Sequence, residues 1–88
     1  MTSSSRKMNA VQREYLRNAQ KAVRVAGSVT WNPVAYAHQV QWAEAYWQNY
    51  LKSTGIRGFQ QRMTEFKAYL ARQDTKGALM YLGEAARL

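Results

Sequence analysis

Basic side chains recur along one stretch of the sequence at spacings that place them on one face of a helix. Steps of seven, four, four and three residues separate Arg6, Arg13, Arg17, Lys21 and Arg24. An α-helix turns by about 100° per residue, so these steps project the side chains onto one side. Most of the set is arginine, whose guanidinium group binds phosphate or carboxylate through two parallel hydrogen bonds. The pattern predicts a surface that binds an anion.

The same charges repel one another when the helix stands alone. Arg13, Arg17 and Lys21 follow one another at i and i+4, and each like-charged pair costs roughly 0.2 to 0.5 kcal/mol. Glu14 is the one acidic residue before Gly27. An anionic partner would remove the repulsion, and phosphate contacts would also release condensed counterions. A solvated face that only keeps the chain soluble is the alternative. We favour binding because the aligned charges share one sign.

Two further basic residues, Arg57 and Arg62, lie in and shortly after a segment flanked by glycines. Residues 55–58 read Gly-Ile-Arg-Gly, which matches neither a phosphate-binding loop nor a dinucleotide fingerprint. The segment therefore predicts a turn between two helices. Its alternative role is anion binding, in which Arg57 reaches a phosphate or carboxylate and Arg62 supports the basic face.

Aromatic residues are concentrated in the middle of the chain, and the set comprises Trp31, Tyr36, Trp42, Tyr46, Trp47 and Tyr50. We assign Tyr36, Trp47 and Tyr50 to the core. Trp42 and Tyr46 are four residues apart and lie off the main apolar stripe of their helix. If they are exposed, they either stack on unpaired bases or anchor a protein partner, and both roles stay open at this point.

The side chains that catalysis or metal binding requires are scarce. His38 is the only histidine, there is no cysteine, and the five acidic residues are scattered along the chain. The residues on the same helix face as His38 are Val34, Gln41, Trp42 and Ala45, and none is a good metal ligand. A lone histidine among apolar residues is usually packed and hydrogen-bonded, and we expect this of His38. The sequence predicts no enzyme, no cofactor and no metal site.

The periodicity of apolar residues places these side chains on helices. The chain has 88 residues and a net charge of +8, and this length fits one domain. Apolar steps of three and four predict helices over residues 6–26, 33–53, 58–73 and 75–87, after a flexible polar lead over residues 1–5. No sustained alternation indicates a strand. The expected fold is all-α, a compact bundle of three to four helices over residues 6–88 whose last two helices form a hairpin.

Residues that start and stop helices set these boundaries. Gly27 is expected to end the first helix, and Asn32-Pro33 to begin the second with a side-chain cap and a proline at the first helical position. Gly55 is placed to adopt the left-handed conformation that ends the second helix. Residue 74 or 75, Asp or Thr, is expected to cap the last helix.

The segment from Phe66 to the C-terminus resembles one tetratricopeptide-type helical hairpin. The family has aromatic, acidic-turn and small packing residues at the positions that correspond to Tyr69, Asp74, Ala78, Leu82 and Ala85. The resemblance covers about a quarter of the chain. It departs from the pattern at Phe66, where the family prefers glycine. It is also not repeated, whereas stacked repeats need three or more copies for stability. It implies a helical hairpin and brings no peptide-binding function to this chain.

Composition and charge leave three classes of partner. Nucleic acid, bound through its phosphate backbone by the basic face, is favoured. The alternative is a protein-interaction module, such as an adaptor, inhibitor or assembly subunit of the phage accessory type, that docks on an acidic protein surface through Trp42 and Tyr46. An anionic membrane surface comes third, because the apolar side of the first helix is rich in alanine rather than in large apolar residues.

Three further expectations follow from length and composition. No apolar run reaches the length needed to span a bilayer. The absence of cysteine is compatible with a reducing, intracellular compartment, and the cytoplasm is the expected location. A core of this size buries a limited share of the chain's surface, so homo-oligomerisation stays open.

Overall fold

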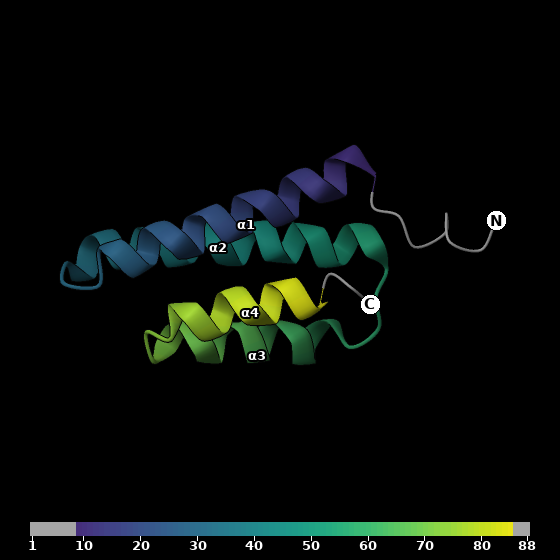
Figure 1. Ribbon diagram of the computed structural model, residues 1–88. Coiled ribbons are helices and arrows are strands. Elements are labelled where there is room, and N and C mark those ends of the chain that lie inside the picture. The colour runs from purple at the N-terminus through teal and green to yellow at the C-terminus, as the bar shows by residue number, and fades with distance from the viewer. Residues whose placement is uncertain (1–8, 86–88) are drawn as a thin grey trace.

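The chain folds into four α-helices joined by short turns (Figure 1). The computed structural model describes residues 9–85. The helices are α1 (Ala10–Ser28), α2 (Pro33–Thr54), α3 (Phe59–Ala71) and α4 (Thr75–Ala85). The hairpin α1–α2 forms one layer and the shorter hairpin α3–α4 forms the other, with α4 packed on α1 and α3 packed on α2. The predicted all-α bundle with a C-terminal hairpin is confirmed.

The first helix begins four residues later than predicted. Asn9 adopts an extended conformation and caps α1, since its side chain accepts a hydrogen bond of 2.8 Å from the backbone N–H of Gln12. The Gln12 side chain accepts in return from the backbone N–H of Asn9 at 3.1 Å. This reciprocal capping box satisfies two backbone donors at once and fixes the start of α1 at Ala10. Arg6 lies outside the described residues.

The other end of α1 also differs from the prediction, because Gly27 does not stop the helix. α1 continues to Ser28, and Gly27 lies inside its last turn. A Cβ atom at Gly27 would lie 2.9 Å from the hydroxyl oxygen of Thr75 at the start of α4. The glycine therefore allows α1 and α4 to approach closely, a tertiary role that its place near a helix end conceals.

The boundaries of α2 follow the sequence signals. The side chain of Asn32 accepts a hydrogen bond of 3.1 Å from the N–H of Ala35, and Pro33 occupies the first turn, as predicted. Gly55 ends α2 in the left-handed conformation with φ of 66°, also as predicted. Gly58 has φ of 77°, so two left-handed glycines make the turn into α3. The Gly-Ile-Arg-Gly segment is thus a helix-to-helix turn.

The turn between α3 and α4 uses the predicted acidic cap. The side chain of Asp74 accepts a hydrogen bond of 2.9 Å from the N–H of Gly77 in the first turn of α4. Gln73 precedes it with a positive φ of 60°, which reverses the chain direction between the two helices. This tight turn brings α4 back along α3.

The core combines aromatic side chains of α2, α3 and α4 with small residues of α1. Trp47 is fully buried, and its ring stacks on Tyr50 with 5.4 Å between centroids. Phe66 and Tyr81 meet the same indole at 5.8 Å. From α1 come the buried residues Leu16, Ala19, Ala22, Val23 and Ala26. Because most of these are small, α1 lies close to its neighbours and leaves its opposite side to solvent.

Candidate functional site

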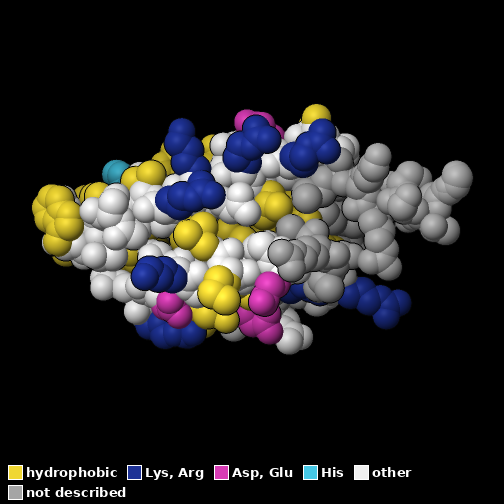
Figure 2. All heavy atoms as spheres, viewed as in Figure 1, with side chains coloured by type: hydrophobic (Ala, Val, Ile, Leu, Met, Phe, Trp, Pro, Cys, Tyr) yellow, Lys and Arg dark blue, Asp and Glu magenta, His cyan; other side chains and the backbone are white. Residues whose placement is uncertain are grey.

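The basic residues of α1 form an exposed row on the side of the helix opposite the core. Arg13, Arg17, Lys21 and Arg24 are all exposed, whereas the buried residues of α1 project to the other side. We call these four residues the basic face. Figure 2 shows Lys and Arg side chains gathered along α1, with an acidic group beside them. The structure therefore assembles four of the predicted anion-binding residues on one solvent-facing surface.

Little negative charge in the fold opposes the basic face. Glu14 approaches Arg17 at 3.8 Å, but both side chains are more than half exposed, and such pairs contribute little. Lys21 and Arg24 form no ion pair with any residue in 9–85. The positive charges of Lys21 and Arg24 are thus available to an external anion.

Lys76 is a candidate that the sequence patterns did not single out. It is exposed and follows Thr75, the residue that the last turn of α1 touches at Gly27. Arg24 lies one turn before Gly27 on α1. Lys76 is therefore an exposed cation at the end of α4 that packs on the last turn of α1. Only the packing of α4 on α1 reveals this, because the two segments are far apart in the sequence.

The structure does not bring Arg57 and Arg62 onto the basic face. Arg57 lies in the α2–α3 turn and Arg62 on α3, and within residues 9–85 helix α3 packs against α2 and α4 but does not contact α1. The Nε of Arg62 donates to the backbone carbonyl of Arg57 at 3.0 Å. The two arginines line a separate polar hollow with Gln61 and Glu65. Arg62 is partly buried and helps to hold the turn.

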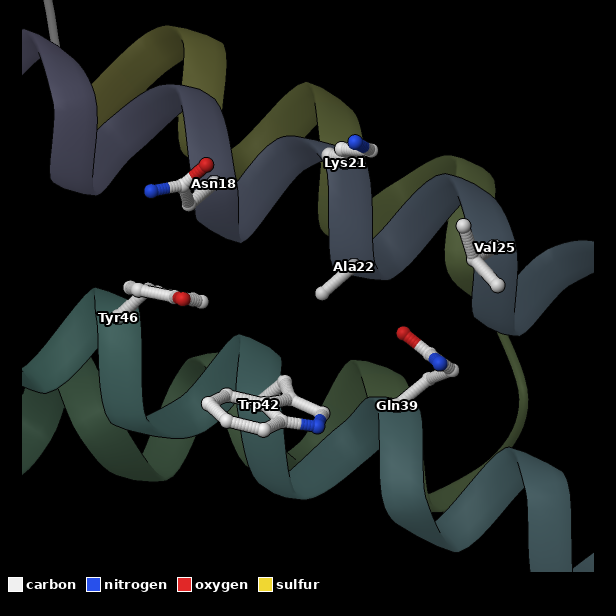
Figure 3. A pocket seen from close by; sticks show the side chains of 7 residues that line it. All are labelled: Asn18, Lys21, Ala22, Val25, Gln39, Trp42 and Tyr46. Atoms are coloured by element: carbon white, nitrogen blue, oxygen red, sulfur yellow. The ribbon is translucent and has the colours of Figure 1, made fainter.

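Trp42 and Tyr46, whose exposure the sequence left open, differ in environment. Their rings stack along α2 with 5.9 Å between centroids and 21° between planes. Tyr46 is partly buried and packs against the core, whereas 55% of the Trp42 side chain is exposed. They line an open hollow between α1 and α2 with a volume of about 320 Å³. In Figure 3 Trp42 and Tyr46 come from α2, and Lys21 and Val25 come from α1.

The expectation that His38 is packed and hydrogen-bonded is wrong. His38 is exposed and lines a second open hollow of about 430 Å³ with Gln41, Trp42 and Ala45. The reason lies in the packing of α2, which is covered by α1 on one side and α3 on another but leaves the face of residues 38, 41, 42 and 45 open. Trp42 lines both hollows, so its indole stands between them.

A third groove lies between α2 and α3 and contains one carboxylate and one ammonium group. Burial raises the pKa of Glu44, and the positive charge of Lys67 opposes that shift. Tyr36, Val40 and Leu70 line the same groove, and the hydroxyl of Tyr36 donates to the backbone carbonyl of Leu70 at 2.5 Å. Because that hydrogen bond links α2 to α3, we assign this groove to the fold.

Two other kinds of feature are absent from residues 9–85, a cluster of metal ligands and a membrane-spanning helix. Nowhere in that range do three or more histidine, cysteine or acidic side chains gather as they would around a metal ion. None of the helices in the same range combines the length and the apolar character of a transmembrane segment.

The chain matches no family model, no characterised protein and no solved structure at a significant level. The likeness of α3 and α4 to a tetratricopeptide hairpin therefore rests on the hairpin itself, in which Ala78 and Leu82 are buried and Asp74 caps α4. The interpretation of the site depends on the basic face and the two hollows around Trp42.

Proposed function

We propose that this chain is a non-enzymatic nucleic-acid-binding protein that contacts the phosphate backbone through the basic face of α1. The observation that carries the proposal is the exposed row of Arg13, Arg17, Lys21 and Arg24, in which Lys21 and Arg24 form no ion pair within residues 9–85 and Arg17 is paired only weakly with Glu14. A row of cations on a rigid helix attracts a polyanion and releases its counterions on binding.

The dimensions of the basic face suit a phosphate backbone. From residue 13 to residue 24 a helix rises by about 16 Å at 1.5 Å per residue. Phosphates on one strand of a duplex advance by about 3.4 Å along its axis, so several lie within reach of the four side chains. The long side chains of arginine and lysine can adjust to either a duplex or a single strand. Contacts to phosphate carry no base information, and binding with little sequence preference is expected.

A protein-interaction module is the second candidate, and the exposed indole of Trp42 favours it. Tryptophan and arginine dominate the binding energy of protein interfaces, and both residue types are exposed here. This alternative places binding on α2 and uses the charge of α1 only to accelerate association. It therefore predicts that charge reversal on α1 leaves the bound complex nearly intact.

Two charge-reversal variants test the proposal against that alternative. Arg17→Glu/Lys21→Glu/Arg24→Glu alters the basic face. Lys52→Glu/Lys67→Glu/Arg72→Glu makes the same change at three exposed positions elsewhere, which are Lys52 on α2, Lys67 on α3 and Arg72 at the start of the α3–α4 turn. Both variants lower the net charge of +8 equally, because each substitution replaces one positive by one negative charge. Fluorescence anisotropy with labelled duplex DNA, single-stranded DNA and RNA reports the affinity.

The expected result is a loss of binding in the α1 variant that is much larger than in the control variant. Equal losses in the two variants would show that net charge alone attracts the polyanion and would contradict a dedicated face. An absence of binding by the unmodified chain to all three ligands at physiological salt would overturn the proposal. Circular dichroism of both variants verifies that the helices remain folded.

A further inference from the structure

The hollow between α1 and α2 joins an exposed aromatic ring to the basic face. Lys21 is one of the four residues of the basic face, and it also lines the hollow whose other side is formed by Trp42 (Figure 3). The two residues are far apart in sequence and meet only because α1 and α2 pack as a hairpin. Lys21 and Trp42 therefore border the same hollow from its two sides.

Trp42 lies on the open face of α2 and does not belong to the core cluster. Its side chain is 55% exposed, whereas Trp47, five residues later on α2, is fully buried and supplies the core contacts. Tyr46 stacks on one side of Trp42. The half-exposed indole leaves a π surface open to solvent, which is what a stacking platform requires.

The remaining walls of the hollow fit a nucleobase. Asn18 and Gln39 line it, and neither side chain makes a hydrogen bond with another residue in 9–85. Their amide groups can both donate and accept, so they can pair with the edge of a base. Val25 and Ala22 supply apolar surface on the α1 side. The hollow thus combines a ring for stacking, amides for base edges and an ammonium group for phosphate.

We infer that the hollow between α1 and α2 binds an unpaired base of a single-stranded nucleic acid, with the base on Trp42 and its phosphate on Lys21. This inference rests on the proposed function and names the form of nucleic acid that the basic face meets. In a duplex each base is stacked on its neighbours and its faces are covered, so only a single strand can present a base to the ring.

The second hollow extends the path of the strand across α2. His38 lies one helical turn before Trp42 on the same exposed face, and both line this hollow. Histidine rings also stack on bases.

A pair of tryptophan variants tests the inference. Trp42→Ala removes the platform, and Trp31→Ala removes a ring that is 77% exposed in the turn between α1 and α2 and lines neither hollow. Affinities are measured by anisotropy for oligo(dT), oligo(U) and a duplex of equal length. We expect Trp42→Ala to weaken binding to at least one of the single strands by about 5- to 150-fold, the factor associated with one stacked base. Duplex binding and the Trp31→Ala variant stay within about twofold of the unmodified chain.

A spectroscopic measurement keeps the inference testable if Trp42→Ala disturbs the fold. In a Trp31→Phe background the indoles are Trp42, which is exposed, and Trp47, which is buried, so quenching by an added strand reports on Trp42. We expect oligo(dT) or oligo(U) to quench this emission, and a Trp31→Phe/Trp42→Phe variant to lose the effect while it still binds the strand.

The outcomes separate this inference from the proposed function. In one outcome all oligonucleotides bind and charge reversal on α1 abolishes binding, but Trp42→Ala binds as tightly as the unmodified chain and the Trp31→Phe variant shows no quenching. The base site is then wrong and the phosphate-binding face stands. The Trp42 surface would then serve another partner, such as a protein. If no oligonucleotide binds, both the inference and the proposed function fail. Comparison of oligo(dT) with oligo(U) shows whether the 2′-hydroxyl contributes.

Discussion

The hydroxyl of Tyr81 on α4 donates a hydrogen bond of 2.8 Å to a carboxylate oxygen of Glu65 on α3. The same hydroxyl lies 3.1 Å from the backbone carbonyl oxygen of Arg62. The ring of Tyr81 packs against Trp47, Phe66 and Tyr69 at centroid distances of 5.8, 6.3 and 5.7 Å. Tyr81 therefore links α4 to α3 by hydrogen bonds and packs the C-terminal hairpin against Trp47 of the core.

This hydrogen bond predicts a pH-dependent contribution to stability. The pKa of Glu65 lies below its ordinary value of 4.5, because the hydroxyl of Tyr81 and the side-chain amide of Gln61 donate to its carboxylate. A lowered pKa in the folded state gives stability that is present above pH 4.5 and is lost as the pH falls through the lowered value. Tyr81→Phe should therefore reduce the free energy of unfolding at pH 7 more than at a pH well below 4.5.

Urea unfolding of the two proteins at both pH values measures that difference. Lys52→Gln, an exposed change at the end of α2, serves as the control and should shift stability equally at each pH. A difference between Tyr81→Phe and the unmodified chain that is the same at both pH values would contradict a role for the ionised carboxylate.

Two glycines of α4 predict opposite effects of the same substitution. A Cβ atom at Gly77 would lie 2.7 Å from a ring carbon of Tyr69 and would collide with the carboxylate of Asp74, the cap of α4. At Gly83 a Cβ atom meets nothing within 4 Å. Gly77→Ala should lower the thermal midpoint, whereas Gly83→Ala should raise stability by about 0.5 to 1 kcal/mol because alanine favours the helix. Calorimetry measures the thermal midpoint of each variant. An increase of the midpoint in both variants would contradict the packing of Gly77 against Tyr69 and Asp74.

Truncation of Phe66 tests the position of the core. Phe66 is fully buried against Trp47 and Tyr81, so Phe66→Ala should reduce the free energy of unfolding by about 3 to 5 kcal/mol. Met80→Ala removes a side chain that is 66% exposed, and it should change stability by less than about 0.5 kcal/mol. Similar losses in the two variants, measured by chemical denaturation, would show that α4 presents a different face to the core.

Local signals in the sequence predicted the parts of the fold that depend on a few neighbouring residues. Asn32 with Pro33, Gly55 and Asp74 act as predicted, because a cap or a left-handed glycine forms its interactions within one turn. The start of α1 also depends on neighbouring residues, the pair Asn9 and Gln12, although the periodicity alone predicted a helix from residue 6.

Features that depend on which helices pack together could not be predicted in this way. Gly27 has the sequence context of a helix end, yet its close approach to Thr75 exists only because α4 lies on α1. His38 and Trp42 lie on a face of α2 that periodicity cannot distinguish from a covered one. The position of Lys76 near the last turn of α1 is likewise a tertiary property. The α1 row was predictable because its residues share a single helix.

Glu14, the acidic residue beside the basic face, predicts a variant that binds oligonucleotides more tightly. Glu14→Gln removes the negative charge beside Arg17 and should strengthen oligonucleotide binding at low salt by a few-fold, since one repulsive contact with phosphate is lost. Glu84→Gln makes the same change in net charge on an exposed part of α4 and is the matched control. Equal gains for the two variants would argue against a specific role of the α1 surface.

The salt dependence of binding tests the central claim most directly. We would measure the dissociation constant for a duplex at a series of salt concentrations, for the unmodified chain and for Arg17→Gln/Lys21→Gln/Arg24→Gln. If the four residues of the basic face each neutralise a phosphate, log K falls with log salt with a slope of about −3 to −4, and the variant loses about 0.9 of that slope per substituted residue. A slope near zero for the unmodified chain, or the same slope for the variant, would contradict phosphate binding by α1.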